Sequence, residues 1–250
     1  MPIWLKVVAG YLIMEPNIYE QIDPDVYRQR GQANEIESYQ FQHWRPRILD
    51  AIAKYAKNAV VLDLGCGPGA DCFEMKKYAA KVYGVDSSQK MIEYAKATYP
   101  GIDFIHADAA ATTLQTGSID TVLSIGLFEY AADKQRVMQE ISRVVKPGGM
   151  AVILAPNKYS MPRGFYALAC AVIGKKRVCS EPSFGQMLRM FKAAGFLLVE
   201  SAMDDGLFFL PRPFEKLLGR RTWLVIEKCF KPFGRNPLSM NMLFIIKKNV

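Results

Sequence analysis

The chain has 250 residues, 50% of them hydrophobic, and 32 Lys and Arg against 24 Asp and Glu give it a net charge of +8. This length and apolar content predict one packed domain over residues 1–250 and exclude a largely disordered chain. No apolar run approaches the roughly 20 residues that cross a bilayer. The N-terminus lacks the basic segment and cleavage site of a signal peptide, so we expect a cytoplasmic protein.

Cysteine usage agrees with that expectation. The five cysteines are scattered, odd in number and without the paired spacing of a zinc site. We therefore expect reduced thiols, no disulfide framework and no bound metal.

The N-terminal third of the chain reads as helical. Residues 4–13 are apolar almost all round a helix, which fits either burial against the body or contact with a membrane surface. A second helical pattern covers residues 35–56, and Pro46 is expected to interrupt it.

From Ala59 onward, strands and helices alternate. We predict strands over residues 59–64, 81–86, 102–106, 119–125, 150–155, 196–201 and 240–247. The turn Lys146-Pro147-Gly148-Gly149 precedes the fifth strand, and a helix is predicted over 183–194. This alternation predicts an α/β fold with a mostly parallel sheet and helices on both faces. In such sheets ligands bind beyond the carboxyl ends of the strands.

The stretch from Val60 to Gly69 contains the principal motif. A buried strand holding Asp63 runs into Gly65-x-Gly67-x-Gly69, ahead of a helix beginning near Ala70. Such a turn lets backbone N–H groups and the helix N-terminus approach a ligand closely. The glycines alone fit two cofactor classes, since Gly65-x-Gly67-x-x-Ala70 also satisfies a loose nicotinamide fingerprint.

Over residues 59–155 the combination of strand order, glycine turn and Pro147-Gly148-Gly149 resembles the class I S-adenosylmethionine-dependent methyltransferases. The neighbourhood of Asp120, Ser124 and Glu129-Tyr130 resembles their small-molecule branch, which contains ubiquinone and menaquinone methyltransferases. The resemblance implies a Rossmann-like, doubly wound seven-stranded sheet with an antiparallel last strand.

The resemblance also implies roles for carboxylates at successive strand ends. Asp63 would meet the ammonium of S-adenosylmethionine through water, Asp86 would accept both ribose hydroxyls, and Asp108 would accept the adenine amine. A nicotinamide cofactor would leave Asp108 without a role. The full predicted cofactor-binding set is Asp63, Gly65, Gly67, Gly69, Asp86, Ser87, Met91, Asp108, Ala109 and Ser124. Ala109 would offer a backbone N–H to the adenine ring, and Met91 would pack against its face.

Charge divides the chain into two parts. Residues 1–155 carry a net charge of −2, whereas residues 156–239 carry +8. We assign residues 36–155 to the cofactor-binding core, and 1–35, 156–182 and 204–239 to a helical and aromatic cap on the substrate side. Aromatic side chains mixed with cations fit a lipid-like acceptor reached from an anionic membrane surface. A lid over a small soluble acceptor explains them equally well.

No catalytic residue is assigned from the sequence. His43, Glu129 and Tyr130 are the nearest candidates by topology, and His106 is expected in the core or beside the cofactor. The predicted activity is in-line methyl transfer to a small or lipid-like acceptor. A nucleic-acid substrate is disfavoured because no recognisable RNA- or DNA-binding module is present. RNA methylation and a non-catalytic cofactor-binding scaffold remain the alternatives.

Overall fold

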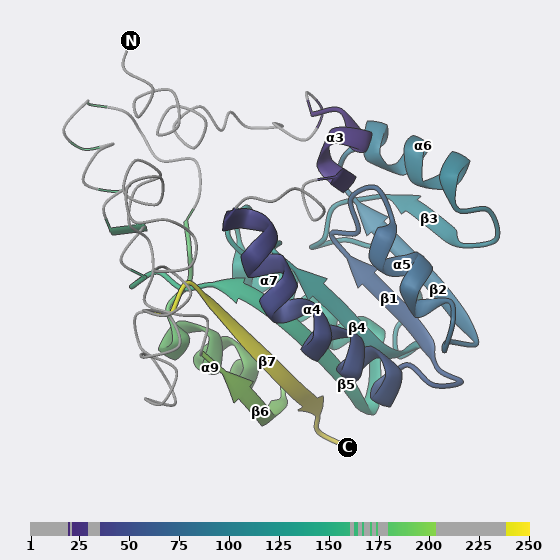
Figure 1. Cartoon of the computed structure of the whole chain (residues 1–250). Helices are drawn as coiled ribbons and strands as arrows, with labels where there is room; N and C mark the ends of the chain where they lie inside the picture. The colour runs from purple at the N-terminus through teal and green to yellow at the C-terminus, as the bar shows by residue number, and fades with distance from the viewer. Residues whose placement is uncertain are drawn as a thin grey trace, which may run out of the picture.

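The computed structural model describes residues 20, 22–29, 36–160, 163, 164, 167, 171, 174, 180–203 and 239–250. These residues form one seven-stranded sheet in the order β3-β2-β1-β4-β5-β7-β6 (Figure 1). The strands are β1 Val60–Leu64, β2 Lys81–Asp86, β3 Asp103–His106, β4 Ile119–Ile125, β5 Val145–Pro156, β6 Phe196–Ala202 and β7 Asn241–Lys248.

Strand directions confirm the predicted topology. The pairs among β1 to β5 are parallel, and β7 runs antiparallel to both β5 and β6. Since β1 lies between β2 and β4, the order of strands reverses at β1 and β4. In a doubly wound sheet this reversal opens a ligand-binding crevice at the carboxyl ends of the strands.

The predicted turn before the fifth strand lies inside β5 as a bulge. Val145 pairs with Ile119, and the register then jumps so that Met150 lies opposite Thr121. A Cβ on Gly149 would come within 2.8 Å of the Asp120 carbonyl oxygen, so only glycine allows this close approach.

The helices form layers on both faces of the sheet. They are α3 Pro24–Gln29, α4 Ile36–Tyr55, α5 Ala70–Met75, α6 Gln89–Thr98, α7 Lys134–Val144 and α9 Phe184–Ala193. Buried side chains of α4, α5 and α6 share one core cluster with the sheet, and those of α7 and α9 share the other. Figure 1 shows α4 crossing the sheet and α3 lying beside α6.

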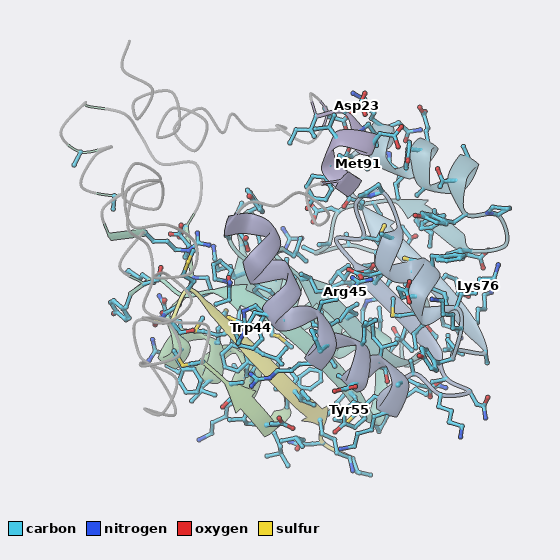
Figure 2. The ribbon with its side chains drawn as sticks, in the orientation of Figure 1. Asp23, Trp44, Arg45, Tyr55, Lys76 and Met91 are labelled. Atoms are coloured by element: carbon cyan, nitrogen blue, oxygen red, sulfur yellow. The ribbon has the colours of Figure 1, made fainter. Side chains whose placement is uncertain are left out.

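The expected interruption at Pro46 is wrong, because α4 continues through it. Pro46 itself is exposed, while Trp44 and Ile48 are only 1% and 2% exposed. A proline inside a helix costs about 3 kcal/mol. Burial of large apolar side chains, worth about 1.5–3 kcal/mol each, offsets that cost. Trp44 and Tyr55, labelled in Figure 2, mark the course of this helix.

Most of the predicted cap, in residues 1–35, 156–182 and 204–239, lies outside the described residues. Among the residues that the structure describes, no helix is both long enough and apolar enough to cross a membrane.

Candidate functional site

The glycine turn closes tightly between β1 and α5. Gly65 and Gly69 have φ angles of +82° and +85°, in the left-handed region that favours glycine. A Cβ on Gly69 would lie 2.8 Å from the Phe104 ring, and one on Gly65 would lie 3.3 Å from Leu127. The turn therefore lies against β3 on one side and against the loop after β4 on the other.

Asp86, at the end of β2, connects the glycine turn to the next helix. Its Oδ2 accepts the Gly67 N–H at 2.8 Å, and its Oδ1 accepts the Ser88 N–H at 2.9 Å. Burial raises the pKa of this carboxyl, and the two backbone hydrogen bonds oppose the rise. Each carboxylate oxygen has a second lone-pair site, so Asp86 can accept two further hydrogen bonds from a ligand.

A second acceptor lies after β3. The exposed side chain of Asp108 uses Oδ1 to accept the Ala110 N–H at 2.7 Å, which leaves Oδ2 for a ligand. Ala109, between them, is half-buried. His106 is exposed, so the core alternative is wrong. Its Nε2 lies 2.9 Å from the carbonyl oxygen of Ser87, and His106 pairs with Asp86 across β2 and β3.

Asp63 is much less accessible than the other two aspartates. It is 3% exposed, and its Oδ2 accepts a hydrogen bond from Cys72 Sγ at 3.4 Å. Burial raises its pKa well above the ordinary value, and the charges of Asp71 and Asp86 add to the rise. Arg45, labelled in Figure 2, reaches from α4 to pair with Asp71 of α5.

Two further predicted residues are buried in the framework of the site. Met91, at the start of α6 and labelled in Figure 2, is 1% exposed and donates its N–H to the Ser88 hydroxyl. Ser124 in β4 is fully buried, and its Oγ makes no hydrogen bond with any residue that the structure describes.

Glu20 and helix α3 supply contacts that the sequence reasoning missed. The Tyr94 hydroxyl of α6 donates to Asp25 at 2.6 Å, and Glu20 accepts the Gln89 N–H at 2.9 Å. The Tyr27 ring lies 3.6 Å from where a Cβ on Gly67 would stand. The only signal for this helix is local: Asp23 before Pro24 is a favoured helix start.

Comparison with known proteins identifies this arrangement. The family described as "Methyltransferase domain" matches residues 62–153. A probable S-adenosylmethionine-dependent methyltransferase of Mycolicibacterium smegmatis is 27% identical over 128 residues, which are 51% of this chain and 49% of that protein. Residues 62–153 thus match a methyltransferase domain, and the chain is similar to S-adenosylmethionine-dependent methyltransferases.

Other relatives of the methyltransferase domain extend further along the chain. A demethylmenaquinone methyltransferase of Staphylococcus aureus is 28% identical over 210 residues, 73% of this chain and 86% of that protein. A Mesorhizobium loti S-adenosylmethionine-dependent methyltransferase structure has the same fold, with a TM-score of 0.59, 21% identity and coverage of 81% and 96% of the two chains. The chain spans only half or less of the length of several other curated relatives.

The cofactor indicated for this methyltransferase domain is S-adenosylmethionine, and the hydrogen-bond acceptors at the strand ends fit it. The spare lone pairs of Asp86 suit a ribose diol, and the Asp108 Oδ2 suits an exocyclic amine. The cofactor-binding roles remain predictions for all ten residues, which are Asp63, Gly65, Gly67, Gly69, Asp86, Ser87, Met91, Asp108, Ala109 and Ser124.

Proposed function

We propose that this protein transfers a methyl group from S-adenosylmethionine to a small or lipid-like acceptor. One observation carries the proposal: at the reversal of strand order, Asp86 holds Gly67 and Ser88 and keeps acceptor capacity for two hydroxyls. A nicotinamide dinucleotide would also use Asp86 for a ribose, but it would leave Asp108 without a role.

The residues of the chain contribute mainly by positioning. When bound, S-adenosylmethionine supplies an electrophilic methyl group for in-line displacement. The glycine turn, Asp86 and Asp108 would fix where that group stands, and the Tyr27 ring of α3 lies close to Gly67. Well-aligned reactants gain up to about 7–11 kcal/mol from such positioning.

A hydrophobic acceptor is supported by two observations outside the cofactor site. The Staphylococcus aureus relative is named for demethylmenaquinone. Residues 156–239 combine a net charge of +8 with many aromatic side chains. Cations beside apolar side chains favour an acceptor held at an anionic membrane surface. We therefore propose a quinol-like or other amphipathic acceptor over a nucleic acid.

Transfer of a labelled methyl group tests this proposal. The full chain is incubated with methyl-labelled S-adenosylmethionine and, separately, a lipid extract, a small-metabolite pool and total RNA. We expect label in the lipid extract, with a smaller amount or none in the metabolite pool, and only background with Asp86→Ala. Label confined to RNA contradicts the proposed acceptor class, and no label anywhere contradicts the proposed activity.

A further inference from the structure

The loop after β4 borders the glycine turn on the side away from Asp86. β4 is the neighbour of β1 opposite β2, and its loop begins at Gly126. Leu127 packs 3.3 Å from the position of a Cβ on Gly65. The Tyr130 N–H donates to the Leu127 carbonyl at 3.0 Å, which turns the chain back towards the strand end. Residues of this loop therefore lie next to the cofactor site.

Glu129 in this loop carries a buried oxygen that has no hydrogen bond to any residue that the structure describes. Its Oε1 lies 3.6 Å from where a Cβ on Gly126 would stand, so the carboxyl folds back towards the end of β4. Its Oε2 is buried and makes no hydrogen bond with any residue in the described part of the chain. The backbone is fixed independently, because the Ser180 N–H donates to the Glu129 carbonyl at 3.0 Å.

The nearby cations are engaged elsewhere. Arg163 Nη1 donates to Glu181 Oε1 at 3.0 Å, and the Glu181 side chain is only 2% exposed. Lys134 Nζ donates to the Ala131 carbonyl at 3.0 Å. Arg163 Nε is also buried and makes no hydrogen bond within the described residues. Among the described residues, an acceptor oxygen of Glu129 and a donor nitrogen of Arg163 thus both lack a hydrogen bond, and the two side chains interact electrostatically.

Burial and neighbouring charges act on the pKa of the Glu129 carboxyl in opposite directions. Burial raises the pKa of Glu129, and the negative charge of Glu181 adds to the rise. The positive charges of Arg163 and Lys134 oppose it. A buried, unsatisfied polar atom costs about 1–3 kcal/mol, so its retention calls for a functional explanation.

We propose that Glu129 binds the methyl acceptor and takes its proton, and that the acceptor therefore carries an O–H or N–H group. This inference rests on the proposed function. The acceptor oxygen or nitrogen forms a new bond to the methyl carbon as the carbon–sulfur bond breaks. The electron pair of the broken carbon–sulfur bond stays on sulfur. The acceptor's proton passes to Glu129 Oε2. An acceptor with a hydrogen-bond acceptor beside that group can also receive Arg163 Nε–H.

Three variants separate this role from a structural one. Glu129→Gln keeps the shape but cannot accept the proton, Glu129→Asp keeps the carboxylate, and Glu93→Gln changes an exposed glutamate of α6 as a matched control. Each full-length variant is measured for thermal unfolding midpoint, affinity for S-adenosylhomocysteine, and transfer of labelled methyl to the lipid extract and the metabolite pool.

We expect Glu129→Gln to unfold at the wild-type temperature or higher, because a neutral amide replaces an unsatisfied buried carboxyl. Its affinity for S-adenosylhomocysteine should stay within about twofold, whereas transfer should fall about 100-fold or more, as for loss of a general base. Glu129→Asp should recover part of that rate, and Glu93→Gln should change none of the three measurements.

Two results overturn the inference. One is an unfolding midpoint of Glu129→Gln lower by more than about 4 °C, which would mean that the carboxylate is paired in the fold. The other is wild-type transfer by this variant. If the wild type binds S-adenosylhomocysteine but transfers label to neither the lipid extract nor the metabolite pool, the unfolding midpoint of Glu129→Gln alone decides whether the Glu129 carboxylate is paired in the fold. If the wild type does not bind S-adenosylhomocysteine, the proposed function fails while the midpoint still reports on Glu129.

Discussion

Asp86 accepts hydrogen bonds from its own chain and, in the account given above, from the cofactor. Its carboxylate holds Gly67 and Ser88, so the same side chain shapes the turn and offers its remaining lone pairs to the ribose. Asp108 is arranged alike, with one oxygen on Ala110 and the other available. Asp86 and Asp108 are thus each partly satisfied by backbone N–H groups and keep acceptor sites for a ligand.

Replacement of Asp86 by alanine should weaken binding of S-adenosylhomocysteine at least tenfold, because each lost hydrogen bond to a charged group costs about 1.5–3 kcal/mol. The unfolding free energy should also fall, since Gly67 and Ser88 lose their acceptor. Calorimetric titration below the unfolding temperature measures the affinity. Asp103→Ala is the control, because its side chain is 57% exposed, pairs with Lys81 of β2 and lies at the opposite end of β3 from Asp108. Unchanged affinity in folded Asp86→Ala would place the ribose elsewhere.

Sequence reasoning could find the residues whose position follows from a motif. Asp63, Asp86 and Asp108 come at strand ends, which a period-two pattern and a glycine turn locate well. It could not find Tyr27, because nothing in a short polar segment predicts which distant turn it covers. It also could not rank Glu129 above His43 and Tyr130, since an unsatisfied carboxyl oxygen exists only in the packed structure.

At the scale of elements, the connection from β3 to β4 depends on one glutamate. Residues 107–118 carry Asp108 and contain no helix or strand. Glu140 of α7 accepts the Thr112 N–H at 2.7 Å and the Thr112 hydroxyl at 2.6 Å, and Arg143 donates to both of its oxygens. This cluster fixes the middle of the connection against α7, and thereby fixes the position of Asp108.

The Glu140 cluster makes stability depend on pH. The hydrogen bonds from Arg143, and then those from Thr112, lower the pKa of Glu140 from 4.5 to about 2. Because the folded pKa is depressed, the stabilisation is complete above pH 4.5 and is lost as the pH falls from 4.5 through about 2. Glu140→Gln should lower the unfolding free energy by about 1–3 kcal/mol at neutral pH. It should also flatten the loss of stability across that acid window.

Denaturant unfolding at several pH values checks this prediction. The exposed Glu93→Gln is again the matched control, and it should leave both the midpoint and the pH profile unchanged. A Glu140→Gln profile that runs parallel to the wild type through the acid window would contradict the assigned role of Glu140.

The presence of the strands was predicted better than where a helix or strand continues without a break. The strand boundaries follow from apolar runs that end in charges or glycines, and all seven strands are present. The passage of α4 through Pro46 could not be predicted, because it depends on tertiary burial of Trp44 and Ile48. The bulge in β5 depends likewise on close contact with Asp120, which the sequence indicates only as a Gly-Gly pair.

At the scale of the whole molecule, the strand order explains why the site lies where it does. The strand order reverses between β1 and β4. This places the glycine turn, the end of β2 and the loop after β4 at one edge of the sheet. The predicted cofactor-binding residues, apart from Ser124 of β4, lie in the β1 to β3 half, and Glu129 lies beyond the reversal of strand order. Cofactor and acceptor would then meet across the crevice between the two halves.

Calorimetric titration of the full chain with S-adenosylhomocysteine, and separately with NADH, tests the central claim most directly. Carboxylates at the ends of β2 and β3 should accept hydroxyl and amine donors, and no cation in the glycine turn is positioned to hold a pyrophosphate among the described residues. The account predicts saturable heat with S-adenosylhomocysteine in the micromolar range and none with NADH. Heat with NADH and none with S-adenosylhomocysteine would contradict it.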